Sequence, residues 1–142
     1  MQLTRFSDYA LRVLMFVANR QGKRTTIREV SEAHQISEEH LMKVVTRLAS
    51  LGYLATFRGK GGGIVPARPP AEISIGSVIR AIEPLAPVEC FESDYDGRCM
   101  LFPQCALRDA LDKAQSRFLE SLDNTTIADV IPSVPAIRSR RR

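Results

Sequence analysis

The residues of this chain whose type and spacing could do chemistry are its three cysteines. Cys90, Cys99 and Cys105 lie in one stretch with the spacing C-x8-C-x5-C. Thiolates are the preferred ligands of iron–sulfur clusters, and a cluster is larger than a single ion, so its ligands can be more widely spaced. The pattern therefore favours an iron–sulfur cluster as the partner of these thiols.

Three other fates of the cysteines are weaker. Structural zinc prefers four ligands, with close pairs about two to four residues apart, and the stretch has no such pair and no nearby histidine. A disulfide would leave one thiol over. It is also disfavoured because Arg5, Asp8 and Arg12 interrupt any apolar run at the start. We therefore expect no signal peptide and a cytoplasmic protein with reduced thiols. Three unrelated cysteines are the last alternative, and their clustering argues against it.

The cysteine stretch has the composition of an irregular, exposed loop. Residues 94–97 are turn formers, and Pro103 can neither continue a helix nor donate to a sheet. The loop is also acidic, with Glu89 and Glu92 among its carboxylates. Carboxylates disfavour neighbouring thiolates, so reactive free thiols are not expected here, whereas a bound metal centre would deprotonate the thiols.

The net charge of +4 hides an asymmetry along the chain. Residues 1–68 contain eleven Lys and Arg against five Asp and Glu, a net charge of +6. Residues 69–137 contain five against eleven, a net charge of −6, and four arginines follow. A basic first half beside an acidic second half suggests that the first half meets a polyanion, although charge alone fits a solvated surface equally well.

The first half predicts a helix-turn-helix. Residues 4–19 open with the cap candidates Thr4 and Ser7 and carry apolar residues at helical spacing. Thr26 begins a capping box for a short helix over residues 27–34, and Ser37 caps a longer helix over residues 38–51, which Gly52 ends. In this motif the second helix lies in the major groove with its N-terminal residues at the base edges. Glu39, His40 and Lys43 would lie there, and Arg47, a turn later, suits phosphate; the alternative is an ordinary helical hairpin.

A predicted wing follows the helix-turn-helix. Residues 53–58 are β-prone, GKGGG occupies residues 59–63, and Ile64 and Val65 return as a second strand. Glycines allow the tip backbone to approach DNA closely, and basic side chains there would reach phosphates or a narrow minor groove. GKGGG is not a nucleotide-binding loop, because the GK[ST] ending is missing. We therefore expect the DNA-binding residues to be Thr26, Arg28, Ser37, Glu39, His40, Lys43, Arg47, Arg58, Lys60 and Gly61.

The second half predicts helices on both sides of the cysteine loop. A helix beginning at Ser74 or Ile75 should run through Ile82, and apolar residues recur at helical spacing from Leu107 to Leu122. Thr125 or Thr126 should cap a last short helix through Ile131. The long helix could pack on its own core or on a second copy. We favour a homodimer, because a helix-turn-helix usually reads two half-sites as a dimer.

The expected fold is mainly α with a small β-wing: a winged helix-turn-helix followed by a long C-terminal dimerisation helix. We expect a DNA-binding module over residues 1–68, the cluster loop and dimerisation helix over residues 69–131, and a disordered basic tail over residues 132–142. No apolar run approaches a membrane span, so no membrane partner is expected. No residue constellation suggests an enzyme.

The chain resembles the IscR/NsrR family of winged-helix repressors over about residues 1–131. The resemblance lies in MQLTRFSDYALRVL, SEEHLMKVVTRLASLGYL, RGKGGGIVPARP, ISIGSVIRAIEP, the three-cysteine loop and LDNTTIADV. It implies a homodimer on double-stranded operator DNA, with each cluster held by three cysteines. IscR-like members take a histidine three residues after the last cysteine as the fourth ligand, and here that position is Arg108.

The chain looks most like NsrR-like members, at MQLTRFSDYALR and VECF. In some of these the aspartate matching Asp8 ligates the cluster of the other subunit. The resemblance implies a repressor that senses nitric oxide and releases DNA when the cluster is nitrosylated or lost. A [4Fe–4S] cluster is favoured over [2Fe–2S], although the gap between Cys90 and Cys99 is longer than in many relatives. Alternatives are a redox or iron–sulfur-status regulator of the same family, or a cluster-independent thiol-based regulator.

Overall fold

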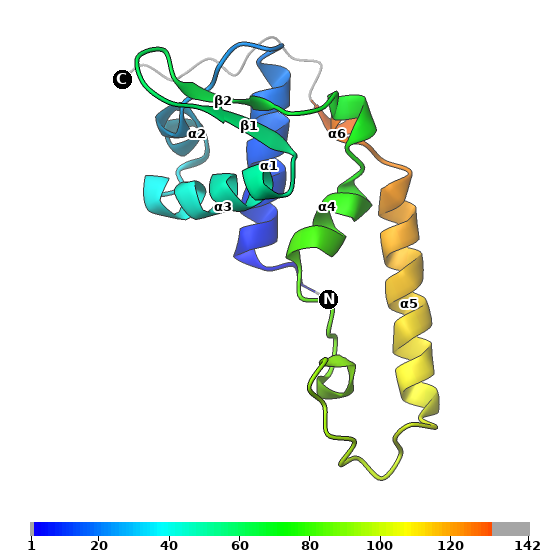
Figure 1. The fold of residues 1–142 in the computed structure, drawn as a ribbon. Coiled ribbons are helices and arrows are strands. Elements are labelled where there is room, and N and C mark those ends of the chain that lie inside the picture. The colour runs from blue at the N-terminus through cyan, green and yellow to red at the C-terminus, as the bar shows by residue number, and fades with distance from the viewer. Residues whose placement is uncertain (1, 132–142) are drawn as a thin grey trace.

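The computed structural model describes residues 2–131. It is mainly helical, with one two-stranded antiparallel sheet, which confirms the predicted fold class of a winged helix-turn-helix (Figure 1). The predicted tail, residues 132–142, lies outside the described residues. In chain order the elements are α1 (Arg5–Asn19), α2 (Ile27–His34), α3 (Glu38–Ser50), β1 (Leu54–Phe57), β2 (Gly63–Pro66), η1 (Pro70–Glu72), α4 (Ile75–Ile82), η2 (Glu89–Phe91), α5 (Ala106–Asp123) and α6 (Ile127–Val130).

Hydroxyl side chains begin the helices, as the sequence predicts. The Thr26 and Thr126 hydroxyls accept from backbone N–H groups in complete capping boxes, and those of Thr4, Ser37 and Ser74 cap α1, α3 and α4. The ends of α3 and α6 fall one residue before the predicted positions. The short 3-10 turns η1 and η2 were not predicted.

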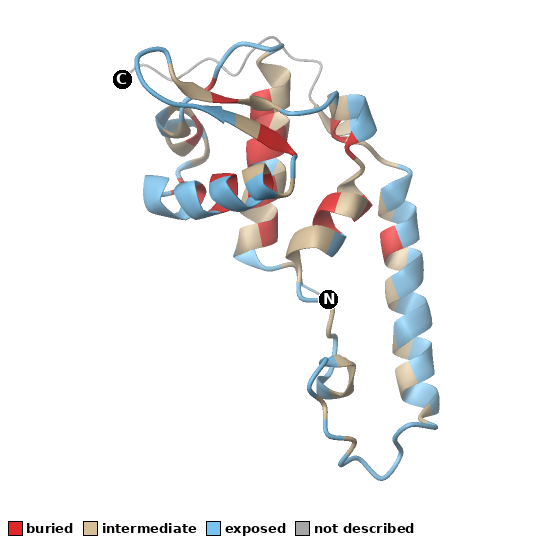
Figure 2. Cartoon of the chain, viewed as in Figure 1, coloured by how far each residue is buried: buried red, intermediate tan, exposed pale blue. Residues whose placement is uncertain are grey.

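Helix α1 runs through the middle of the packed body and supplies the centre of its core. Its Ala10, Val13 and Val17 side chains are fully buried, at the spacing the sequence predicts. They pack in one cluster with apolar side chains of the other elements, including residues beyond position 68 (Figure 2). These side chains include those of Val30, Leu41, Val44, Leu48, Ile64, Ile73, Val78 and Ile127.

The wing is a hairpin whose strands pair from Leu54 opposite Pro66 to Phe57 opposite Gly63. It is attached to the start of α2 because Thr25 and Ile64 exchange backbone hydrogen bonds of 2.8 and 3.0 Å. At Gly63 the backbone has φ +145°, and a Cβ atom there would lie 2.9 Å from the Thr25 carbonyl oxygen. Glycine therefore permits this close approach between the wing and the α2 entry.

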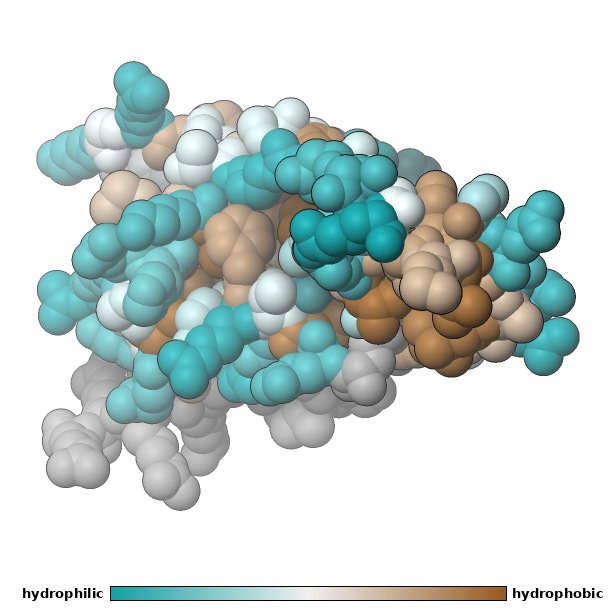
Figure 3. Space-filling view, turned by 90° about the horizontal axis from the view of Figure 1, so that it is seen from below, coloured by the Kyte–Doolittle hydropathy of each residue, from teal (hydrophilic) through white to brown (hydrophobic). Residues whose placement is uncertain are grey.

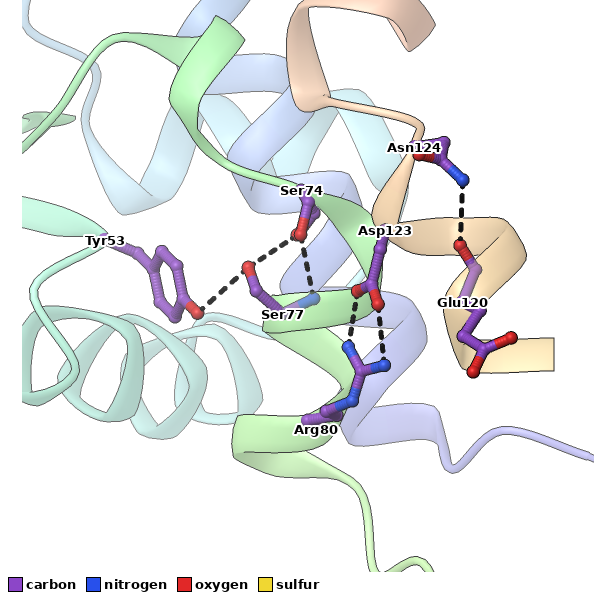
Figure 4. Close-up of polar contacts among 7 residues, drawn as sticks. All are labelled: Tyr53, Ser74, Ser77, Arg80, Glu120, Asp123 and Asn124. Carbon is purple, nitrogen blue, oxygen red and sulfur yellow. Dashed lines mark hydrogen bonds and ion pairs between the residues drawn. The ribbon is translucent and has the colours of Figure 1, made fainter. Parts of the chain in front are cut away.

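Helices α4 and α5 cross closely and form the stem of the cysteine loop. Gly76 lies at the contact, where a Cβ atom would be 2.9 Å from the carbonyl oxygen of Leu119. Arg80 and Asp123 form a bidentate ion pair across the contact, with Nη2 and Oδ2 2.7 Å apart (Figure 4). The other end of α5 extends away from the body, so the loop lies beyond the packed core (Figure 1).

Candidate DNA-binding surface and cysteine loop

The predicted base-reading residues lie together on the exposed face of α3. Glu39, His40 and Lys43 are all exposed. Lys43 donates to the Glu39 carboxylate at 3.0 Å, and this hydrogen bond lowers the pKa of Glu39. The His40 ring nitrogen Nδ1 lies 2.9 Å from the hydroxyl of Ser37. The face therefore combines an ion pair with an imidazole near the start of the helix, where a major-groove helix meets base edges.

The predicted site residues on α2 are engaged within the helix. The Thr26 hydroxyl accepts from the backbone N–H of Glu29 at 3.2 Å as the cap. Arg28 donates to Glu32 at 2.9 Å, and both side chains are largely exposed. An exposed pair of this kind is weak and can exchange its carboxylate partner for a phosphate.

Arg47, predicted to contact phosphate, is exposed and also contacts the protein itself. Its Nη2 donates to the backbone carbonyl of Ala81 at 3.0 Å, which joins α3 to the last turn of α4. The sequence could not show this contact, because the two residues lie far apart along the chain.

The wing tip is basic and exposed, as predicted. Arg58, Lys60 and Gly61 are all exposed, and Gly61 has φ +78°. Sequence reasoning missed Arg24, which donates to the Gly61 carbonyl at 2.6 Å and lies 4.1 Å over the Phe57 ring. Arg24 therefore fixes the tip relative to α2; its only signal in the sequence is its membership of the basic first half.

The cysteine loop carries three free thiols. Cys90 lies in η2, Cys105 is the residue before α5, and both are half-buried, whereas Cys99 is exposed. The backbone N–H of Cys99 donates to the Tyr95 hydroxyl at 2.8 Å. Tyr95 in turn packs edge-on against Phe102, with ring centroids 5.4 Å apart.

Arg108 organises this loop. Its Nε donates to the carbonyl of Cys90 at 3.4 Å, and its guanidinium lies 4.8 Å from the Phe91 ring centre and 5.9 Å from that of Phe102. Arg108, which stands where IscR-like relatives have a histidine ligand, thus contacts both arms of the loop. The sequence marked Arg108 only as an absent ligand.

The donor set suits a soft, thiolate-bound group rather than one hard ion. Within residues 2–131, His, Cys, Asp and Glu side chains do not gather in threes at a spacing suited to a single ion. Three thiols on an otherwise unpacked loop match the preference of iron–sulfur clusters for sulfur ligands. Cys90, Cys99 and Cys105 are therefore the residues that could hold such a group.

Asp8 lies on α1, apart from the cysteines of its own chain. Its Oδ1 accepts from the Arg12 guanidinium at 2.8 Å, and both side chains are about half exposed at 45% and 47%. This hydrogen bond raises the pKa of Arg12. An exposed ion pair of this kind costs little to rearrange, so the Asp8 carboxylate is not fixed to Arg12.

Glu83, just before the cysteine loop, holds the first turn of α1. Its carboxylate accepts from the backbone N–H of Thr4 at 3.1 and 3.2 Å, from the Thr4 hydroxyl at 2.9 Å, and from the Ser7 hydroxyl. A carboxylate at a helix N-terminus satisfies free N–H groups and complements the helix dipole. The serine and threonine were visible in the sequence as caps, but their partner was not.

Together these features define a class: a winged-helix DNA-binding protein with a thiol-bearing loop between two crossing helices. The family model for Rrf2, an iron-dependent transcriptional regulator, matches residues 3–133. The chain therefore belongs to the Rrf2 family of transcriptional regulators, which bind DNA and are not enzymes.

Individual relatives agree with this assignment. The chain is 46% identical to the HTH-type transcriptional regulator NsrR of Geobacillus kaustophilus over 141 residues, 98% of this chain and 95% of the relative. Among solved structures, CymR of B. subtilis, the global cysteine regulator, superimposes with a TM-score of 0.73 at 26% identity, covering 92% of this chain and 96% of CymR. IscR of T. potens gives a TM-score of 0.71 at 22% identity, covering 91% and 85%, and shares the fold.

No helix within the described residues is long and apolar enough to cross a membrane.

Proposed function

We propose that this regulator is a homodimeric repressor that binds operator DNA, holds an iron–sulfur cluster and releases the DNA in response to nitric oxide. Cys90, Cys99 and Cys105 would hold the cluster together with the partner's Asp8. The observation that carries the proposal is the cysteine loop, where all three cysteines of the chain are free and lie outside the packed core. The 46% identity to a protein named NsrR supports the choice of signal.

The thiols are suited to a cluster because no protein group competes for them. All three are free, and Arg108 draws the backbone of Cys90 toward the arm carrying Phe102. When bound, the cluster would supply a thiolate-ligated iron centre with one oxygen-ligated, more labile iron open to nitric oxide. We favour [4Fe–4S] over [2Fe–2S]. The setting would be the cytoplasm, where thiols stay reduced.

The homodimer is supported by apolar surface around the loop and the free end of α5. Leu107 is 66% exposed and Met100 is 99% exposed. Figure 3 views the molecule with the cysteine loop toward the reader and shows hydrophobic surface gathered on this side. Val88, Leu101 and Phe102 are further exposed apolar residues of this region. Contiguous exposed apolar surface of this kind is typical of an interface, and a second copy would cover it.

The contacts at the end of α4 provide a route from the loop to the DNA-binding module. Ala81 accepts the hydrogen bond from Arg47 on α3, and Glu83 holds Thr4 and Ser7 on α1. The cysteine loop begins directly after these residues. A displacement at the start of the loop would therefore shift both α1 and the predicted recognition helix. In a dimer, a small rotation is enough to spoil the spacing that two half-sites require.

The DNA-binding residues keep their predicted roles in this proposal. The exposed start of α3 would read base edges through Glu39, His40 and Lys43. Arg58 and Lys60 at the wing tip would contact backbone phosphates or the minor groove. Arg47 is exposed and would keep its predicted contact with phosphate, while its Nη2 binds the Ala81 carbonyl.

A second candidate is a cluster-independent, thiol-based regulator of the same family. The observation that favours it is Cys99, an exposed free thiol, because an accessible thiol can be oxidised without any bound metal.

The test is to purify the protein anaerobically and measure its visible absorption together with its iron and sulfide content. The proposal predicts broad visible absorption, iron and sulfide in equal amounts, and loss of operator binding after addition of nitric oxide. A colourless protein without iron that binds DNA in its reduced form and loses it on mild oxidation would contradict the proposal and favour the thiol-based alternative.

A further inference from the structure

One large apolar side chain of α3, that of Met42, lies on the face that points away from the core. Leu41, Val44 and Leu48 are at most 1% exposed and form the buried face of the helix. Met42 is 55% exposed. It lies in the first half of the helix, directly between Leu41 and the exposed Lys43. Core packing does not explain a methionine at this position, so its surroundings on the outer face are informative.

Met42 lies in an open depression on the outer face of α3. The residues that line it are Glu39, Met42, Lys43, Thr46, Arg47 and Ser50. Met42 and Thr46 are one helical turn apart and therefore neighbours on the surface. A partner that enters this depression would meet the methionine side chain in the middle of the exposed face.

The polar groups around Met42 already have partners within the protein. Thr46 donates its hydroxyl to the Met42 carbonyl at 2.8 Å, and Ser50 donates to the Arg47 carbonyl at 2.8 Å. Lys43 is paired with Glu39 at 3.0 Å. The Met42 side chain and the methyl group of Thr46 are apolar and make no hydrogen bonds in this depression. They form an apolar strip, which we define as Met42 and the methyl group of Thr46.

The chemistry of the major groove offers one apolar group to such a strip. Every base edge presents hydrogen-bond donors or acceptors, and only thymine adds a methyl group, at C5. Methionine is flexible and polarisable, so it fits an irregular apolar surface well. We infer that the apolar strip of α3 is a specificity determinant that selects thymine, through its C5 methyl group, at one position in each half-site. This inference rests on the proposal that α3 enters the major groove.

The experiment replaces thymine by uracil, which removes only the methyl group. An operator is first recovered with the full-length, anaerobically purified protein by selection from a random duplex library. Each thymine of one half-site is then changed to uracil in turn, and the affinity is measured for the parent and for Met42→Ala. We expect the parent to lose about fourfold in affinity at one thymine, the effect of one buried methyl group. Met42→Ala should bind the thymine and uracil forms equally there.

A matched variant, Met42→Leu, keeps an apolar side chain and should retain most of the discrimination. Because Met42 is exposed, the variants should fold, and circular dichroism checks this. A flat uracil scan for the parent, together with altered operator preference for Lys43→Ala, would overturn the thymine inference alone. If His40→Ala and Lys43→Ala also leave the operator preference unchanged, the assignment of α3 as the reading helix fails as well.

Discussion

The winged-helix body and the cysteine loop of this protein are held together in different ways. In the body, α1 and α3 each bury an apolar face, and side chains cap the helix starts. In contrast, none of residues 80–118 is buried (Figure 2). The loop is ordered instead by a few polar and aromatic contacts, of which those of Arg108 and Tyr95 are the main ones.

This difference indicates that the body provides the stability of the fold and that the loop is the part that can rearrange. A segment with few buried apolar contacts has low local stability and can rearrange without unfolding the rest. The loop is therefore the part of the molecule that a bound group can order. The body, with its own core, should remain folded whether or not that group is present.

The largest expected effect is on metal binding. Changing Cys90, Cys99 or Cys105 singly to alanine should abolish stable cluster binding, because no other thiol can replace the lost ligand. The same variants should keep the circular dichroism spectrum and thermal midpoint of the cluster-free parent, since the loop contributes nothing to the core. Iron analysis and thermal melts check both statements. A variant with full visible absorption would remove that cysteine from the ligand set.

The next effect is on the stability of the body. Leu41→Ala should lower the free energy of unfolding by about 2–5 kcal/mol, because Leu41 is fully buried and its truncation leaves a cavity. Ser93→Ala in the loop is the control and should change it by less than about 0.5 kcal/mol, since Ser93 is exposed and lies outside the apolar surface proposed for the dimer. Urea titrations of the cluster-free proteins measure both values. Equal losses in the two variants would contradict the contrast between body and loop.

A smaller effect is expected at the wing. Arg58→Ala should weaken binding to all DNA sequences alike and reduce the salt dependence of affinity by about one ion. His40→Ala should instead change the preference among operators, because it lies on the reading face of α3. Titrations at several salt concentrations separate the two behaviours. A sequence-dependent loss for Arg58→Ala would place that side chain at a base edge.

The smallest effect concerns pH. Burial, reinforced by Arg12, lowers the pKa of His34, whose ring packs edge-on against Phe16 at 5.6 Å. The unfolded chain therefore binds a proton more readily than the folded one. Stability should be complete above the ordinary histidine pKa of about 6.5 and should fall as the pH drops below it. Unfolding measured on both sides of that value checks this, and His34→Gln should lose the dependence.

Local structure could be predicted from the sequence because its causes are local. The capping box at Thr26, the cap at Ser37 and the glycine that ends α3 at residue 52 each depend on residues a few positions apart. The buried stripe of α1 followed from periodicity alone. The exposed basic wing tip followed from its glycines and charges.

Contacts between distant segments could not be predicted in this way. The contact of Arg47 with the Ala81 carbonyl lies outside its predicted role, which was to bind phosphate. Glu83, which follows the wing in the chain, binds the first turn of α1. Arg108 stands where IscR-like relatives have a histidine ligand, and here it joins the two arms of the cysteine loop. Each of these depends on how α4 and α5 pack, which no spacing in the sequence specifies.

The central claim is that the state of the cysteine loop controls DNA binding through the partner's Asp8. The most direct measurement is operator affinity of the anaerobic, cluster-containing protein before and after nitric oxide, for the parent and for Asp8→Ala. Arg12→Ala is the matched control, because it breaks the same ion pair but keeps the carboxylate. We predict that Asp8→Ala keeps a cluster with an altered spectrum, yet binds the operator nearly as weakly as the cluster-free parent, while Arg12→Ala keeps more of the affinity. The claim would be contradicted if the Asp8→Ala variant bound the operator as tightly as the parent and still released it on addition of nitric oxide.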